Sequence, residues 1–143
     1  MRSLMQIVKP GVLHSDCLNE VTNQYVKELL AITKGDKFYL AGNCQAAVIA
    51  YWMAKELGSM DCCPEKLFLM EWTSSWGPYQ GATVFLYGEG SYSRFIYEDE
   101  QEQGHPWKIE FPYSKALSIQ GQHAKFFNDV NVVSLAARVK IEL

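Results

Sequence analysis

The sequence of 143 residues lacks the features that mark several large classes of protein. No stretch approaches the 18 or so apolar residues of a membrane span, and residues 1–13 lack the continuous apolar core of a secretory signal. Thirteen basic residues stand against sixteen acidic ones, and the basic ones are scattered singly. We therefore expect a soluble, cytoplasmic protein, or one delivered from the cytoplasm without such a signal, that binds neither nucleic acid nor membrane.

Motifs for metal and nucleotide chemistry are missing as well. The sequence has no C-x-x-C, H-E-x-x-H, EF-hand or G-x-S-x-G pattern, and the turn at Gly88–Ser91 lacks the lysine of a phosphate-binding loop. The cysteines do not show the dense spacing of a secreted disulfide scaffold; they are Cys17, Cys44, Cys62 and Cys63. We predict reduced thiols, no metal and no cofactor.

The composition is that of an ordinary folded domain. Hydrophobic residues make up 48% and aromatic residues 13% of the chain, which excludes intrinsic disorder. A chain of this length buries about two-thirds of its unfolded surface. With no linker and no internal repeat, residues 1–143 are predicted to form a single domain.

Two helices are predicted. Apolar residues recur at helical spacing from Ser15 or Asp16 to about residue 34. A second segment, Cys44–Leu57, follows the favoured N-cap residue Asn43 and is apolar almost all round. A helix without a polar face is normally central and buried.

The remainder has the pattern of strands. Candidate strands are residues 66–72, 82–87, 92–97, 108–113 and 133–143. The second and third flank a glycine-rich turn and suggest a hairpin. The predicted fold class is α+β, with an N-terminal helix and a buried central helix packed on an antiparallel β-sheet.

Cys44 is the first candidate for chemistry. A thiol in the first turn of a helix faces unpaired N–H groups and the positive end of the helix dipole, which favour the thiolate. Backbone N–H groups at Cys44 and Gln45 would hold an oxyanion, and Asn43 lets the backbone approach a ligand. The alternative is a small buried apolar residue without chemistry.

His105 is the second candidate, because a cysteine nucleophile needs a base contributed from elsewhere in the fold. It follows an acidic run at 98–102 and precedes a predicted strand. The alternatives are a surface histidine and a solvated acidic loop.

Gly42-Asn43-Cys44 opening an apolar helix, followed by Gly104-His105-Pro106-Trp107, resembles the papain-like cysteine superfamily, above all its transglutaminase-like and bacterial effector branches. The resemblance spans residues 42–122 and concerns layout and two short motifs. It implies a papain-like core, and a polar residue after the histidine that orients the imidazole.

Several residues fit that third position. Gln120 and Gln122 lie at suitable spacing after His105. His123 competes with His105 as the base, and Asn128 or Asp129 would then orient it. Both arrangements stay open at this point.

The segment 73–81 is rich in glycine, serine and aromatic residues. Rigid rings give contact area at low entropic cost, so Trp76 and Tyr79 are predicted to bind substrate. The alternative is a loop whose aromatic side chains fold back into the core.

Two functions follow from these residues. The first is a small cysteine hydrolase or acyl transferase, of bacterial or phage type, acting on an amide or thioester in a peptide, a glutamine side chain or a cell wall. The second is a non-catalytic binding protein, such as an immunity protein, inhibitor or accessory factor, that docks through an acidic, aromatic surface. Either function implies a peptide or protein partner.

Overall fold

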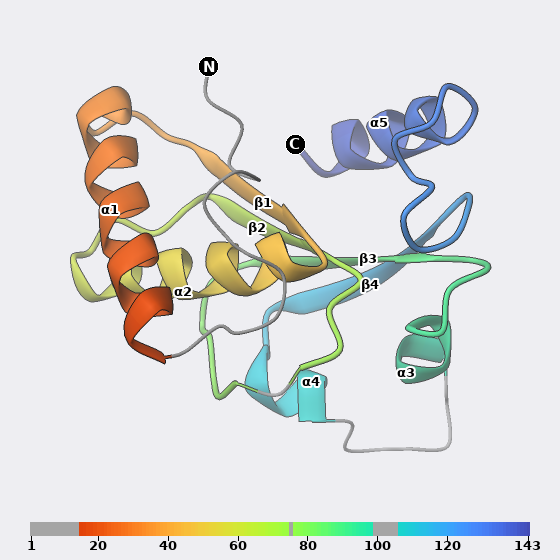
Figure 1. Cartoon of the computed structure of the whole chain (residues 1–143), viewed down its shortest axis with the longest axis horizontal. Coiled ribbons are helices and arrows are strands. Elements are labelled where there is room, and N and C mark those ends of the chain that lie inside the picture. Colours follow the sequence, from red (N-terminus) through yellow and green to blue (C-terminus); the bar gives the residue numbers. More distant parts are fainter. Residues whose placement is uncertain (1–14, 75, 99–105) are drawn as a thin grey trace.

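The chain contains five helices and four strands within the described residues, and the strands form one parallel sheet (Figure 1). The computed structural model describes residues 15–74, 76–98 and 106–143. The elements in chain order are α1 (Ser15–Thr33), β1 (Tyr39–Asn43), α2 (Gln45–Ser59), β2 (Lys66–Met70), β3 (Thr83–Gly88), α3 (Arg94–Glu98), α4 (Pro106–Glu110), β4 (Ser114–Ile119) and α5 (Asn131–Glu142).

The sheet has four strands in the order β1-β2-β3-β4, and every neighbouring pair is parallel. Asn43 pairs with Met70, and Met70 pairs with Leu86 on the next strand. At the far side Gly88 pairs with Ile119. The carboxyl ends of all four strands therefore lie along one edge of the sheet.

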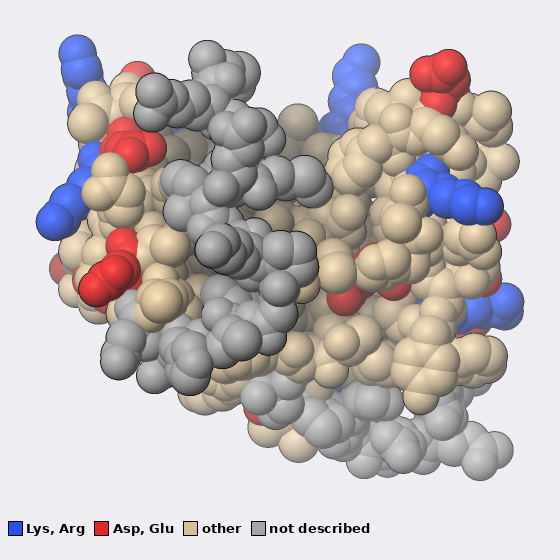
Figure 2. All heavy atoms as spheres, in the orientation of Figure 1, with Lys and Arg blue, Asp and Glu red and all other residues tan. Residues whose placement is uncertain are grey.

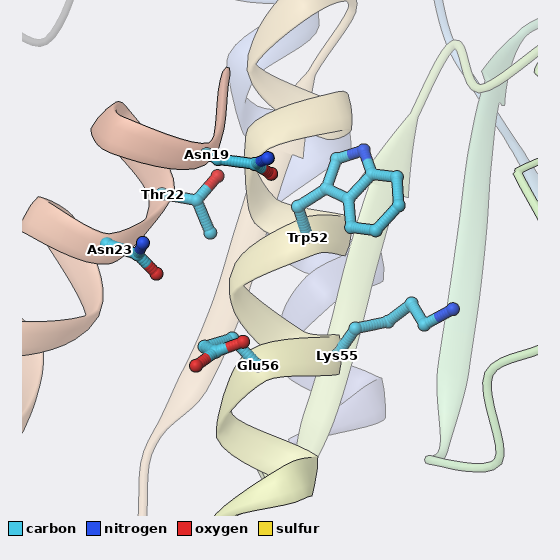
Figure 3. A pocket seen from close by; sticks show the side chains of 6 residues that line it. All are labelled: Asn19, Thr22, Asn23, Trp52, Lys55 and Glu56. Carbon is cyan, nitrogen blue, oxygen red and sulfur yellow. The ribbon is translucent and has the colours of Figure 1, made fainter. Parts of the chain in front are cut away.

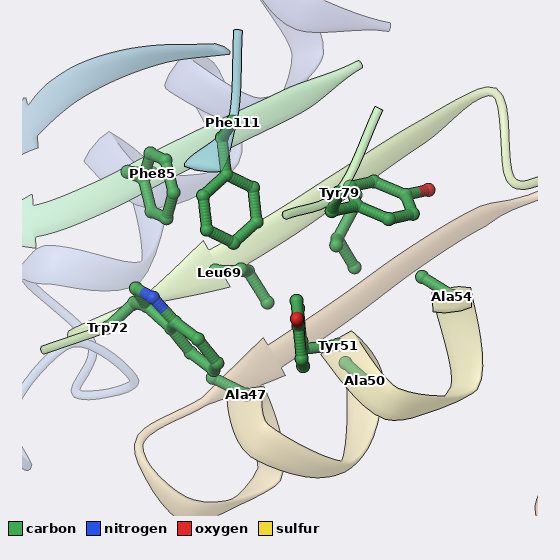
Figure 4. Close-up of a cluster of buried hydrophobic side chains, with 10 residues drawn as sticks. Ala47, Ala50, Tyr51, Ala54, Leu69, Trp72, Tyr79, Phe85 and Phe111 are labelled. Carbon is green, nitrogen blue, oxygen red and sulfur yellow. The ribbon is translucent and has the colours of Figure 1, made fainter. Parts of the chain in front are cut away.

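Both faces of the sheet are covered. On one face α2 packs its alanines and Tyr51 against β2, β3 and the rings of Trp72 and Phe111 (Figure 4). On the other face Phe68 and Leu86 pack with residues of the β4–α5 segment, among them Leu135. A sheet buried on both faces needs continuous apolar strands, which explains the sequences KLFLM and TVFLYG.

The predicted α+β class with an antiparallel, papain-like sheet is wrong, because all strand pairs are parallel. The expected hairpin does not form: residues 94–98 are a helix, and β3 pairs with β4 instead. Residues 106–110 are helical as well. The short strands β1 and β4 fall in segments for which no strand was predicted.

The C-terminal segment 131–142 is a helix, not a strand. Its apolar residues alternate, which suits a strand, but they also include an i, i+4 pair that suits a helix. The structure uses this pair: Leu135 is buried against the sheet and Val139 packs beside it, whereas Val133 and Ile141 are exposed.

No helix within the described ranges combines the length and the apolar composition needed to cross a bilayer.

The helical register of α5 gives a test of the fold. Leu135 is 7% exposed and Val133 is 69% exposed, although an alternating strand would place both on one face. We expect Leu135→Ala to lower the free energy of unfolding by about 2–4 kcal/mol through the cavity it leaves. Val133→Ala should change it by less than about 0.5 kcal/mol. Urea denaturation followed by circular dichroism measures both, and equal losses would contradict the helix.

Candidate active site

The candidate site lies at the carboxyl edge of the sheet. Cys44 directly follows β1, Glu71 directly follows β2, and His123 lies in the segment after β4. In open parallel sheets this edge is where ligands bind, because the loops after the strands meet there. The three chemically active side chains therefore come from three different strand ends.

Cys44 occupies a sharp turn between β1 and α2. Its φ of 53° and ψ of −117° are unusual for a residue other than glycine. Gly42 permits the turn, because a Cβ added there would lie 2.3 Å from the carbonyl oxygen of Ala46. A strained strand-to-helix turn that leaves its central residue exposed is the arrangement known as a nucleophile elbow.

The structure modifies the expected oxyanion donors. The backbone N–H of Cys44 donates to the carbonyl of Met70 at 3.0 Å, so it is already engaged. Gln45 is the first residue of α2, where N–H groups have no partner within the helix. Asn43 ends β1 rather than capping the helix, and its side-chain oxygen is buried. Of the two donors predicted, only the Gln45 N–H stays available.

Glu71 is held at a fixed place beside His123. Its side chain is buried and its φ is 56°. One carboxylate oxygen accepts a hydrogen bond from the Gly88 N–H at 2.8 Å, and the other accepts one from the Ser93 hydroxyl at 2.6 Å. The second oxygen lies 4.0 Å from Nδ1 of His123. A carboxylate next to Nδ1 orients an imidazole so that Nε2 can serve as a base.

The remaining predicted site residues are placed differently. His105 lies outside the described residues. Gln120 and Gln122 are exposed in the segment between β4 and α5. Asn128 lies shortly before α5, and its side-chain oxygen accepts a hydrogen bond from the N–H of Asn131, the first residue of that helix. Asp129 is exposed.

Glu71 is the site residue that the sequence reasoning did not identify. The signal was an acidic residue directly after the buried run KLFLM, at the end of a strand. A second signal was the spacing Gly42-x-Cys44-x-Ala46, which resembles the G-x-S-x-G elbow pattern with cysteine in place of serine and alanine in place of the last glycine. Each signal points to a site only once the sheet is known to be parallel, because only then do the ends of the strands lie along one edge.

The two aromatic side chains of segment 73–81 differ in exposure. Trp76 is 42% exposed, whereas Tyr79 is buried among the rings packed on α2. The hydroxyl of Tyr51 lies within hydrogen-bond distance of the Trp76 and Gly77 carbonyls, at 2.9 and 2.8 Å. Burial raises the pKa of Tyr51 and of Tyr79 to about 12, so both phenols stay protonated at neutral pH. Of the two predicted substrate-binding rings, Trp76 alone is accessible.

A pocket of about 420 Å³ lies between α1 and α2 (Figure 3). Its lining includes Thr22, Glu56 and the indole of Trp52, and none of the residues at the strand ends. It is therefore separate from the candidate site.

Charges of both signs are interspersed on the face seen in Figure 2. Among the residues coloured by charge in this view, the acidic ones do not gather into one broad area. Among the residues that the structure describes, no three His, Cys, Asp or Glu side chains are grouped so that they could hold a metal ion.

A parallel sheet with helices on its faces, a strained turn after one strand and a buried acidic residue after the next defines an α/β architecture. No family model and no curated protein matches the sequence. Solved structures do match the fold, among them three thioesterases.

The NocB thioesterase domain from the nocardicin cluster superimposes with a TM-score of 0.68 at 13% identity, over 87% of this chain and 72% of that one. The type II thioesterase YbtT of the yersiniabactin pathway gives 0.64 at 12%, over 86% and 72%. The RedJ thioesterase of Streptomyces coelicolor gives 0.61 at 12%, over 88% and 68%. The chain therefore has the α/β-hydrolase-like fold of these thioesterases.

The predicted membership of the papain-like and transglutaminase-like cysteine hydrolases is wrong. The sheet of this chain is parallel, and the solved structures that share its fold include thioesterases, among them a serine-to-alanine variant of YbtT. The error arose because both folds place a nucleophile at the start of a helix and a histidine further along the chain.

Gly42 provides a test of the elbow. We expect Gly42→Ala to lower the free energy of unfolding by about 1–3 kcal/mol, because its Cβ meets backbone atoms that cannot move aside. It should also slow the alkylation of Cys44 by iodoacetamide. Gly58→Ala is the matched control within α2, where a Cβ meets only the Cys63 sulfur at 3.5 Å, an ordinary contact. Equal stability and alkylation rates in the two variants would disprove the constraint.

Proposed function

We propose that the protein is a thioesterase-like hydrolase or acyl transferase that acts on an acyl thioester, with Cys44 as nucleophile, His123 as base and Glu71 as the residue that orients the base. The observation that carries the proposal is the pairing of the strained Cys44 turn with the Glu71–His123 contact at the same sheet edge. His123 takes the role first considered for His105, because it lies against a buried carboxylate.

The reaction would proceed in two halves. In the first, Nε2 of His123 accepts the proton of the Cys44 thiol, and the sulfur attacks the thioester carbonyl. The oxyanion is held by the N–H of Gln45, and the leaving thiolate takes the proton from His123 as the tetrahedral intermediate collapses. The products of this half are a free thiol and an acyl group on Cys44.

In the second half a water molecule, or another acceptor, attacks the acyl group on Cys44. His123 accepts a proton from the attacking water and returns it to the Cys44 sulfur as the acid is released. The Glu71 carboxylate, which faces Nδ1, would stabilise the imidazolium form of His123. Its own charge is stabilised by the Gly88 N–H and the Ser93 hydroxyl.

Two kinds of support favour a thioester over an amide substrate. The matching structures bear the name thioesterase. The thiolate of a thioester is also a better leaving group than an amine, so it needs less assistance from the acid. The acyl donor would be carried by a peptide, a protein or a small thiol.

The non-catalytic alternative receives no specific support. A binding protein has no need for a non-glycine residue with positive φ at a strand-to-helix turn, nor for a buried carboxylate next to a histidine.

The proposal is tested by hydrolysis of short-chain and medium-chain acyl thioesters of N-acetylcysteamine, followed by release of free thiol. Cys44→Ala should abolish turnover, and His123→Ala should lower kcat by about 100-fold or more because the base is lost. Cys17→Ala is the matched control, since Cys17 is also exposed but lies on α1.

Mass spectrometry of the protein after a short incubation should show the acyl group on the peptide that contains Cys44. Turnover that survives Cys44→Ala, or acylation at Cys17 with none at Cys44, would reject the proposal.

A further inference from the structure

We propose that Ser91 and Ser93 are positioning residues that together set the geometry between Glu71 and His123. The inference rests on the proposed function, because it assigns a role to residues that act through the base and its acid. Both serines belong to the segment that links β3 to α3, and both are buried, at 6% and 2% exposure.

Ser93 acts on the acid. Its hydroxyl donates to Oε2 of Glu71 at 2.6 Å, and this same oxygen is the one that lies 4.0 Å from Nδ1 of His123. The Gly88 N–H holds the other oxygen at 2.8 Å. With both oxygens bound, the carboxylate cannot rotate about its terminal bond, and the oxygen facing the imidazole is fixed.

Ser91 acts on the base. Its Oγ accepts a hydrogen bond from the backbone N–H of His123 at 2.7 Å. One residue earlier, the N–H of Gly90 donates to the carbonyl of Gly121 at 3.0 Å, which ties the two segments together at a second point. The backbone that carries His123 is therefore anchored to the same segment that anchors Glu71.

The segment itself has little freedom. The N–H of Ser91 donates to the Gly88 carbonyl at 2.9 Å, which closes a tight turn. A Cβ on Gly88 would lie 2.5 Å from the Ser91 Oγ and 2.7 Å from the Gly121 carbonyl oxygen. The end of β3, the Ser91 side chain and the backbone at Gly121 are therefore packed too closely for a larger residue at position 88. Ser91 and Ser93, two residues apart in this segment, therefore fix the backbone of His123 and the carboxylate of Glu71 relative to the same turn.

Neither serine touches the reacting atoms. Ser93 contacts the carboxylate, and Ser91 contacts the main chain of His123. Their contribution is therefore to the alignment of the imidazole, which governs the rate of proton transfer and not the affinity for substrate.

The experiment measures kcat and KM for hydrolysis of an acyl thioester of N-acetylcysteamine. Ser93→Ala should lower kcat by about 10-fold or more, as expected for the loss of a hydrogen bond to a charged group, and leave KM within about twofold. Ser114→Ala is the matched control. Its hydroxyl donates a hydrogen bond as that of Ser93 does, but to the backbone carbonyl of Phe111, at the amino end of β4.

A double-mutant cycle separates positioning from a general structural role. If Ser93 acts through the carboxylate, Ser93→Ala should cause little further loss in a Glu71→Gln background. The same factor in both backgrounds would overturn the inference. Ser91→Ala should lower kcat in the wild type and add little to His123→Ala.

Two further variants separate the loss of the Ser93 hydrogen bond from misfolding and from a failure of the proposed function. Ser93→Cys preserves the side-chain size and folding but supplies only a weak donor, so its kcat should also fall; full activity would overturn the inference. Cys44→Ala distinguishes the two proposals. Activity that survives Cys44→Ala rejects the proposed function, whereas a dead Cys44→Ala with an unchanged Ser93→Ala rejects the positioning role alone.

Discussion

Parallel pairing of the four strands is the constraint on which the rest of the structure depends. Parallel neighbours cannot be joined by a tight turn, so a crossover must return the chain to the starting edge each time. The crossover between β1 and β2 contains α2, whose alanines allow close contact with the sheet. Because every strand runs the same way, every strand end reaches the same edge, and residues far apart in the sequence meet there.

The strand ends then determine which side chains can cooperate. Cys44, Glu71 and the His123 segment follow three strands in the order of the sheet, with the β3–α3 segment placed between the last two. Glu71 follows an interior strand and is buried, while Cys44 follows β1 and is exposed, as the roles proposed for them require. This division suits a carboxylate that must keep its orientation and a sulfur that must reach a substrate.

The sequence allowed part of this to be predicted. The helix periodicity of residues 15–33 and the largely apolar character of α2 identified both helices. Cys44 was singled out as a residue of the first helical turn, whereas in the structure it lies one residue before the helix. The pairing of strands could not be predicted, because an apolar run such as KLFLM fits a buried strand of either direction. The residues of α5 satisfied the periods of a strand and of a helix at once, and only packing decided between them.

Glu71 could not be identified from the sequence for the same reason, namely that the direction of the strands was unknown. Glu71 carries no local motif; it becomes recognisable once β2 and β4 are known to run in the same direction and to place Glu71 and His123 at one edge. His123 was considered as a base, but Asn128 and Asp129 were considered as its partners because they lie nearby in the sequence. The structure shows that the partner is contributed by a segment more than fifty residues away.

The sulfur at the elbow has a thermodynamic consequence. Transfer of an acyl group from a thioester to Cys44 exchanges one thioester bond for another, so the first half-reaction is close to isoenergetic and runs in both directions. Transfer to a serine oxygen would form the more stable ester and would be downhill. In the proposed reaction, an acylated Cys44 would therefore retain the full reactivity of the original donor. The identity of the acceptor, whether water, a thiol or an amine, would then determine whether that reaction is a hydrolysis or a transfer.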